Sequence, residues 1–180
     1  TNTGGNASYD LKANGVSINT NASTSSYSYN HTNITANTSY ELVVTQGTSV
    51  ITRKFNVIVN PGTTTQAIPA GLEEGINYNA SDATKATLVL DAPNKDFVYV
   101  AGSFNNWQPN AAYAMKKDPS STKFWLELTG LTSGQTETYQ YWIVKQSPIA
   151  NSPSLVKTAD PYSTLVLSNY DDPYIPAASY

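Results

Sequence analysis

The stretch of sequence that decides the fold is VYVAGSFNNW, residues 98–107. Its first half is apolar at successive positions, which predicts a strand buried on both faces. Two small residues end this run, and the rings of Phe104 and Trp107 then bracket Asn105 and Asn106. Asparagine favours turns because its side chain bonds nearby backbone groups and tolerates left-handed conformations. The stretch therefore predicts a strand that runs into a turn, where the Trp107 ring can pack inward or face a ligand.

The composition indicates strands and turns and excludes several classes of site. Only 13% of the 180 residues are charged, against about 25% in a typical soluble protein, and 13 residues are tyrosine. The net charge of −3 offers no basic face, so we expect no nucleic-acid partner. The absence of cysteine excludes disulfides and thiolate metal sites, and no cofactor is predicted. No segment has the run of about 20 apolar residues that a membrane-spanning helix needs.

Residues 1–60 are predicted to form an immunoglobulin-like or fibronectin-like module. The dipeptide Asn14-Gly15 favours a two-residue hairpin turn. The module is either minimal or has its first strands upstream of Thr1, because about 60 residues is short for a sandwich of about 100. Strand signals occur at residues 8–12, 16–18, 27–29, 40–45 and 50–59.

Residues 61–74 are predicted to be a linker with some freedom, and residues 75–180 a second module. No window of the second module shows an apolar helical period. Trp125 and Trp142 are expected to pack in its core or between domains. Strands are predicted at residues 75–78, 85–93, 97–101, 123–128, 137–144 and 164–167, with a loop at 145–157. The predicted fold class is all-β, with two immunoglobulin-like β-sandwich modules in tandem.

The motif at residues 98–107 closely resembles the hallmark of carbohydrate-binding module family 48, the early-set, glycogen-binding-like domains. The resemblance extends over about residues 75–174. The segments Ala159–Tyr162 and Asp171–Tyr174 are also similar to bacterial family 13 α-amylases. In those secreted enzymes an immunoglobulin-like domain and a family 48 domain precede the catalytic barrel. The resemblance implies a secreted or cell-surface protein and an α-glucan, such as starch or glycogen, as a partner.

The resemblance also implies a sugar-binding site, from which this chain departs at two positions. Glycogen-binding members stack glucan on two tryptophans, one of which matches Trp107. The second has no counterpart in residues 144–149, and the lysine of the family matches Gln140. These departures favour a packing role over independent glucan binding. The candidate carbohydrate-binding residues are Trp107, Asn105, Asn106, Gln140 and Lys145.

The sequence lacks signs of catalytic chemistry. A family 13 hydrolase uses paired carboxylates in a barrel of about 250 residues, whereas the carboxylates here fall mostly in turns. Asp160 with Asp171 and Asp172 offers oxygen atoms of the kind that Ca²⁺ prefers, but without EF-hand spacing, and no metal site is predicted. We expect non-catalytic modules that position the barrel of a secreted α-glucan-degrading enzyme. The alternatives are a working α-glucan-binding module that stacks sugar on Trp107, or a spacer or adhesion pair without a link to glycans.

Overall fold

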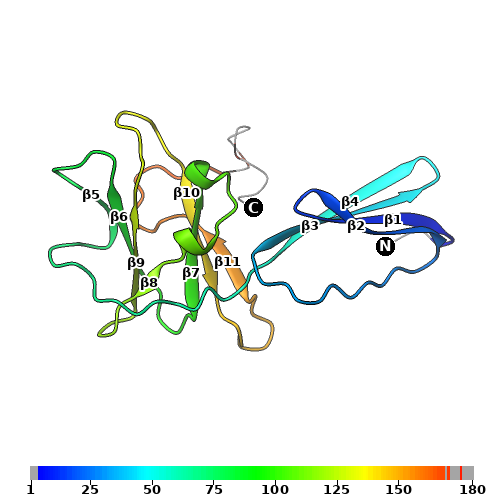
Figure 1. Ribbon diagram of the computed structural model, residues 1–180, viewed down its shortest axis with the longest axis horizontal. Helices are drawn as coiled ribbons and strands as arrows, with labels where there is room; N and C mark the ends of the chain where they lie inside the picture. Colours follow the sequence, from blue (N-terminus) through cyan, green and yellow to red (C-terminus); the bar gives the residue numbers. More distant parts are fainter. Residues whose placement is uncertain (1–3, 169, 171–174, 176–180) are drawn as a thin grey trace. The chain divides into compact units, whose positions relative to one another are not determined.

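The computed structural model describes residues 4–168, 170 and 175 of the chain. These residues form eleven strands in three antiparallel sheets, with two short 3₁₀ turns and no α-helix (Figure 1). The predicted all-β class is therefore confirmed. The chain divides into two compact units, Thr1–Val59 and Asn60–Tyr180.

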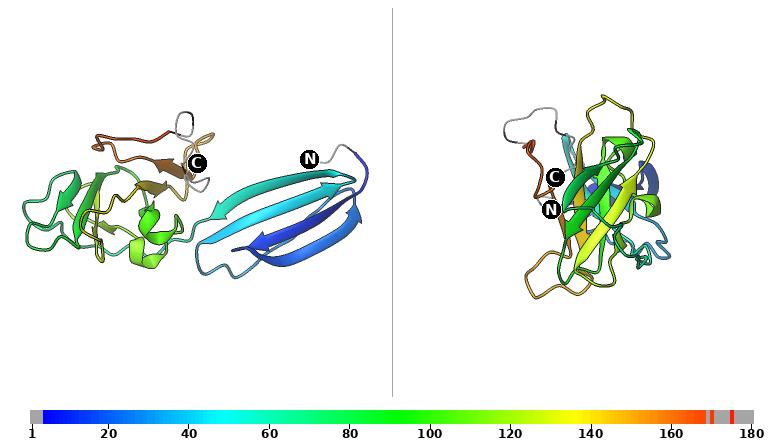
Figure 2. Two further views of the ribbon diagram at one scale, coloured as in Figure 1. Left: turned by 90° about the horizontal axis from the view of Figure 1, so that it is seen from above. Right: turned by 90° about the vertical axis from the view of Figure 1, so that its left-hand side faces the viewer.

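The first unit contains one four-stranded sheet in the order β2-β1-β3-β4 (Figure 2). Its turn at Asn14 and Gly15 has φ of 48° and 81° at the two positions, which is the backbone that a primed hairpin turn requires. The predicted hairpin is thus confirmed. The strands are β1 (Ala7–Ala13), β2 (Val16–Thr24), β3 (Thr38–Gln46) and β4 (Ser49–Val57).

The strand predicted at residues 27–29 is wrong, because these residues belong to a coil that covers the sheet. Tyr27 stacks on Tyr9 of β1 with ring centroids 5.0 Å apart, and its hydroxyl donates to Asn19. The alternating tyrosines therefore supply cover for one face rather than pair with a neighbouring strand. Within residues 4–59 the structure describes a single sheet, so an immunoglobulin-like sandwich is not confirmed for this unit.

A second group of aromatic side chains lies on the same face of the sheet. Tyr40 of β3 stacks on Phe55 of β4 at 5.0 Å, and His31 of the coil lies edge-on to Tyr40. His31 Nδ1 is 2.6 Å from the Tyr40 hydroxyl. Tyrosine and phenylalanine rings thus supply much of the apolar burial that a second sheet would give in a sandwich.

The second unit consists of two sheets that enclose a common core. One sheet has the order β11-β10-β7 and the other β5-β6-β9-β8. The strands are β5 (Gly75–Tyr78), β6 (Ala86–Asp91), β7 (Phe97–Gly102), β8 (Lys116–Lys117), β9 (Lys123–Leu128), β10 (Tyr139–Val144) and β11 (Leu155–Thr158). Buried core residues come from both sheets: Leu88, Leu90, Val98, Val100, Phe124, Leu126, Leu128 and Tyr141, with Ala92 and Met115.

The C-terminal part of this unit differs from the prediction. Residues 164–167 form no strand, although they are the apolar sequence TLVL. The last strand of the described residues is β11, which begins inside the predicted loop at 145–157 and ends one residue beyond it. It pairs with β10, with Trp142 opposite Lys157. The segment that pairs with β10 is the one that reaches its edge, and apolar composition alone does not predict which segment that is.

The predicted linker at residues 61–74 is attached to the second unit over part of its length. The Gln66 amide donates to the Lys117 carbonyl at 3.0 Å, and Trp125 Nε1 donates to the Gln66 carbonyl at 2.9 Å. A bridge between Thr65 and Lys117 extends the sheet by one step. The polar side chains of the linker bury little surface. Its backbone groups nevertheless pair with the sheet edge at Lys117 of β8.

Gly102 is the position at which we expect a single methyl group to damage the second unit most. A Cβ there would lie 2.5 Å from the Thr138 carbonyl oxygen and 2.7 Å from the Phe104 ring. Overpacking of this kind costs about 1–3 kcal/mol. We expect Gly102→Ala to lower the unfolding free energy by that amount in urea denaturation followed by tryptophan fluorescence. Ser152→Ala, in an exposed loop, is the control, and equal midpoints for both variants would contradict the packing described.

Candidate functional site

The turn after β7 is built by the side chain of Asn105. In this turn, which contains the 3₁₀ segment η1 (Ser103–Asn105), the Asn105 carbonyl oxygen accepts from the Gly102 amide at 2.9 Å. Its Nδ2 donates to the Val100 carbonyl at 2.9 Å. Asn105 was predicted as a sugar contact, but both of its polar ends serve the turn.

The next two residues adopt left-handed backbone conformations. Asn106 has φ of 52° and Trp107 has φ of 59°. A bulky residue in this region is strained by about 1–3 kcal/mol, and a hydrogen bond from the Trp107 amide to the Gly102 carbonyl at 2.9 Å holds it there. Asn106 is exposed and Trp107 is half-buried. The turn therefore directs the Trp107 ring away from the sandwich core.

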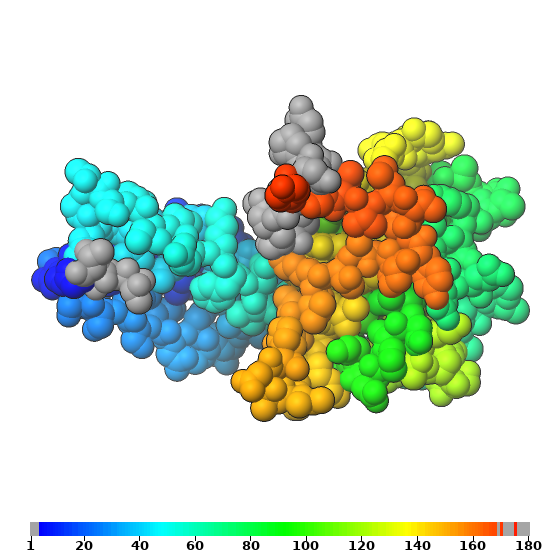
Figure 3. All heavy atoms as spheres, turned by 180° about the vertical axis from the view of Figure 1, so that it is seen from behind, coloured from blue at the N-terminus to red at the C-terminus, as the bar shows by residue number. Residues whose placement is uncertain are grey.

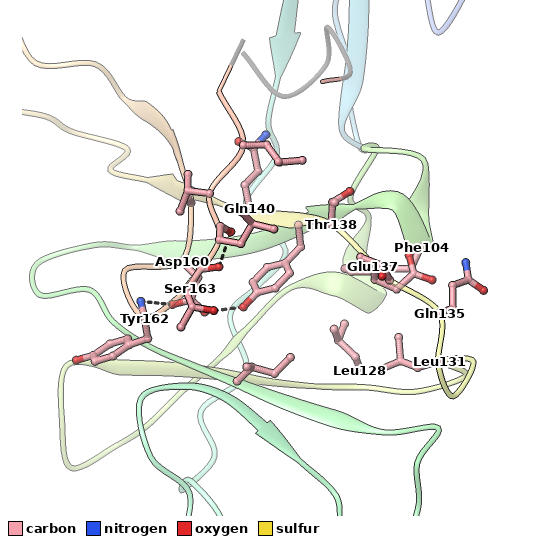
Figure 4. A pocket seen from close by; sticks show the side chains of 18 of the residues that line it. Phe104, Leu128, Leu131, Gln135, Glu137, Thr138, Gln140, Asp160, Tyr162 and Ser163 are labelled. Carbon is pink, nitrogen blue, oxygen red and sulfur yellow. Dashed lines mark hydrogen bonds between the residues drawn. The ribbon is translucent and has the colours of Figure 1, made fainter. Parts of the chain in front are cut away.

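Trp107 lines a groove of about 1040 Å³ within the second unit. The groove lies between the loop at residues 131–138, strand β5 and the segment at residues 162–168. Gln140 of β10 also lines it, so the structure brings two of the five predicted residues together (Figure 4). Figure 4 shows Gln140 and Asp160 on one side of the groove and Leu128 and Leu131 on another.

Lys145, another predicted residue, lies far from this groove. Strand β10 pairs with β7 from Tyr139, opposite Gly102, to Val144, opposite Phe97. Five residues at about 3.3 Å each separate Lys145 from Gln140, which is about 16 Å along the strand. Lys145 Nζ instead lies 3.3 Å from a carboxylate oxygen of Asp96.

Two buried side chains on one face of β10 have nitrogen atoms without a partner. Gln140 is 7% exposed and Trp142 is 3% exposed. Neither Gln140 Nε2 nor Trp142 Nε1 has a hydrogen-bond acceptor among the residues that the structure describes. Lys157 of β11 lies opposite Trp142, with its Nζ 4.5 Å from the indole centroid. Burial lowers the pKa of the Lys157 ammonium. Gln140 and Lys157 line the groove, and Trp142 does not.

A buried carboxylate anchors the segment that follows β11. Asp160 accepts hydrogen bonds from the Tyr139 hydroxyl at 2.7 Å and from the Tyr162 amide at 2.8 Å (Figure 4). It also accepts from the Tyr141 hydroxyl at 2.9 Å. Burial, together with the negative charge of Asp160, raises the pKa of both buried tyrosines well above the ordinary value. This cluster was not predicted, although the alternation that places Tyr139 and Tyr141 on one face of the strand was visible in the sequence.

The other two tryptophans are buried, as predicted. Trp125 is 4% exposed and Trp142 is 3% exposed. Lys116 Nζ lies 4.3 Å from the centroid of the Trp125 ring. These rings belong to the packing of the second unit and offer no exposed platform for a ligand.

Among the described residues, no group of three or more His, Cys, Asp or Glu side chains is placed to hold a metal ion. Of the predicted oxygen donors for Ca²⁺, Asp171 and Asp172 lie outside the described residues. The described part of the chain also has no helix with the length and hydropathy for crossing a bilayer.

Comparison with known proteins adds no relative. No protein-family model matches the chain, and no curated protein is similar to it in sequence. The fold and the groove define the chain as an all-β protein with a two-sheet unit and a groove lined partly by aromatic side chains.

The Asp160 cluster predicts that the second unit loses stability in alkali. The raised pKa of Tyr139 and Tyr141 keeps both protonated when folded, whereas unfolded tyrosines ionise near pH 10. Their contribution is therefore complete below pH 10 and is lost as the pH rises above it. We expect urea midpoints that are constant from pH 8 to 9 and fall from pH 10 to 11.

Tyr139→Phe removes one of the two ionising groups and should make this fall shallower than in the unsubstituted chain. Equal slopes in the two proteins, or a midpoint independent of pH up to 11, would contradict the assignment.

Proposed function

We propose that the second unit is a non-catalytic module that packs against the catalytic barrel of a secreted α-glucan-degrading enzyme and fixes its orientation. The observation that carries the proposal is a row of exposed apolar side chains after the Asp160 anchor. Leu165 is 76% exposed, Val166 57% and Leu167 44%. Figure 3 shows this segment, in orange, lying open on the surface of the unit. Apolar surface of this kind marks protein–protein contacts.

Strands β5 and β11 of the same unit carry further exposed apolar side chains. Ile76 and Tyr78 of β5 and Val156 of β11 are also exposed, and Ile76, Tyr78 and Leu165–Leu167 all line the groove. We name these six residues the apolar surface. The surface lies beside the segment that leads toward the C-terminus, so a domain that follows in the same polypeptide would meet it first. The resemblance of Ala159–Tyr162 to family 13 α-amylases, beside the family 48 motif at residues 98–107, supports a family 13 barrel as that domain.

The carboxylates of the chain support a role without bond cleavage. A retaining glycosidase needs one carboxyl group with a raised pKa, which acts as the general acid. Among the described residues, hydrogen bonds chiefly lower the pKa of five carboxyl groups: Glu41, Glu74, Asp82, Asp96 and Asp118. Of the two acidic residues that line the groove, Asp160 is engaged by two tyrosines, and Glu137 accepts from the Ser103 hydroxyl.

A second candidate function is binding of an α-glucan in the groove. The observation that favours it is the meeting of Trp107 and Gln140 in one groove, although they are far apart in sequence. The indole face would stack on the C–H groups of a glucose ring, and the Gln140 amide would donate to a hydroxyl. Phe104 and Tyr139 add further aromatic surface to the same lining.

The packing role predicts that the apolar surface matters only when the barrel is present. In the 180-residue chain, Leu165→Ser with Leu167→Ser should change the unfolding free energy by less than about 0.5 kcal/mol per site, because both side chains are exposed. In the polypeptide that includes the barrel, the same pair should destabilise the enzyme by about 3–6 kcal/mol, from about 1.5–3 kcal/mol per buried leucine. Urea denaturation of both forms measures this.

Val16→Ser is the matched control, since Val16 is 67% exposed but belongs to the first unit. The proposal fails if the leucine pair leaves the full enzyme as stable as the control does, or if the polypeptide carries no barrel.

The glucan-binding candidate predicts saturable heat release when the chain is titrated with maltoheptaose at millimolar concentration. Calorimetry is the appropriate measurement because it does not depend on the tryptophan that is replaced. Trp107→Ala should abolish the signal, whereas Lys145→Met should leave it unchanged because Lys145 lies at the far end of β10. A flat titration of the unsubstituted chain would eliminate this candidate.

A further inference from the structure

The hairpin turn of the first unit presents an Asn-Gly dipeptide to solvent. Asn14 and Gly15 are both exposed and lie between β1 and β2, with φ of 48° and 81°. An asparagine side chain carries an amide carbon, Cγ, that the next backbone nitrogen can attack to close a five-membered ring. The reaction is favoured where that nitrogen is open to approach and where its N–H group is not held by an acceptor.

The backbone nitrogen of Gly15 meets both conditions. Its N–H group has no hydrogen-bond acceptor among the described residues. Glycine has no Cβ, so another group can approach its backbone closely. Beyond the two adjacent residues, no atom lies within 4 Å of the position that a Cβ would take. This nitrogen is therefore accessible to hydroxide, which removes its proton, and to the side chain that it attacks.

The side chain of Asn14 provides the electrophile and the leaving group. Its oxygen accepts a hydrogen bond from the Ser39 amide at 3.0 Å. A donor at this oxygen stabilises the negative charge that develops there when Cγ is attacked. The other end of the side chain, Nδ2, has no acceptor within the part of the chain that the structure describes. Nδ2 is thus free to leave into solvent.

The other asparagines with a left-handed backbone lack this combination. Asn14 is the only asparagine in the sequence that a glycine follows. The next residue in each other case has a side chain that crowds the attacking nitrogen. These pairs are Asn33 before Ile34, Asn94 before Lys95, Asn106 before Trp107 and Asn151 before Ser152.

We propose that Asn14 is a site of spontaneous modification, at which deamidation converts asparagine into aspartate and isoaspartate. The deprotonated Gly15 nitrogen bonds to Asn14 Cγ, and the Cγ–Nδ2 bond breaks as Nδ2 takes a proton from water and leaves as ammonia. One water molecule then opens the cyclic imide. Opening at Cγ gives aspartate, and opening at the backbone carbonyl carbon gives isoaspartate. No oxidant or reductant takes part, and the inference is independent of the proposed function.

The two products have different effects on the hairpin. Aspartate keeps the length of the backbone and an oxygen that accepts from the Ser39 amide. Isoaspartate adds a methylene group to the main chain, and a two-residue loop has no room for it, because its twist must match that of the flanking strands. Strand β1 pairs with both β2 and β3, so this change reaches the centre of the sheet. The isoaspartate product therefore loosens the first unit as the protein ages.

The test incubates the 180-residue chain at 37 °C and locates deamidation by mass spectrometry, with electron-transfer fragmentation to separate the two products. We expect Asn14 to be converted at least tenfold faster than Asn33 or Asn94. The rate should rise in proportion to the hydroxide concentration between pH 7.5 and 8.5, because the attacking nitrogen must lose its proton. Asn14→Gln, which cannot close a five-membered ring, is the control and should stay unmodified at this position.

Two outcomes of this experiment would overturn the proposal. One is conversion of Asn14 no faster than that of Asn33 or Asn94. The other is conversion confined to the chain unfolded in urea, which would show that the folded turn protects Asn14.

Amide hydrogen exchange tests the effect on the hairpin. In the aged chain, the Ser39 amide of the isoaspartate form should exchange at least tenfold faster than in the fresh chain. Asn14→Asp represents the aspartate product and should exchange at Ser39 as the unsubstituted chain does, since it keeps the acceptor. Equal exchange in the isoaspartate form and in Asn14→Asp would overturn the inferred loosening of the first unit.

Discussion

The structure of the second unit depends on the burial of strand β7 on both faces. All six residues from Phe97 to Gly102 are buried. Val98 and Val100 belong to the sandwich core, and the alternate residues face the other side of the sheet. A slip of one residue would exchange these two sets, so the packing fixes the register of β7 against β10. That register places Gln140 opposite Ala101, one residue before the turn that carries Trp107.

Strained backbone and unpaired polar atoms occur at and beside the candidate site. Trp107 has a left-handed backbone, and Gln140 and Trp142 bury nitrogen atoms without described partners. Strain and unpaired polar groups persist in a folded protein only where the surrounding structure over-determines them, and they are concentrated at functional sites. Here the buried strands β7 and β10 and the hydrogen bonds of Asn105 supply that support. The rigid sandwich therefore holds the walls of the groove in place.

Asp160 gives the segment after β11 a fixed starting point. Two of its hydrogen bonds tie this segment to tyrosines of β10, and the third comes from the Tyr162 amide of the segment itself. The Tyr162 hydroxyl also donates to Glu74, beside β5. The apolar side chains that follow are therefore presented from an anchored position. This arrangement links the two proposals, because the same segment forms one wall of the groove and supplies half of the apolar surface.

The sequence by itself determined the all-β class, the hairpin at Asn14-Gly15 and the strand at residues 123–128, because alternation and turn residues act over a few neighbouring positions. It also predicted Trp107 and Gln140 as carbohydrate-binding residues, and both line one groove in the structure. Only the tertiary structure decided that β11 pairs with β10 while residues 164–167 do not, that Tyr27 covers a sheet, and that Lys145 lies away from the groove. Each of these depends on which segments, distant in sequence, occupy a sheet edge or an apolar face. Local sequence patterns cannot predict this, because they reflect only interactions between neighbouring positions.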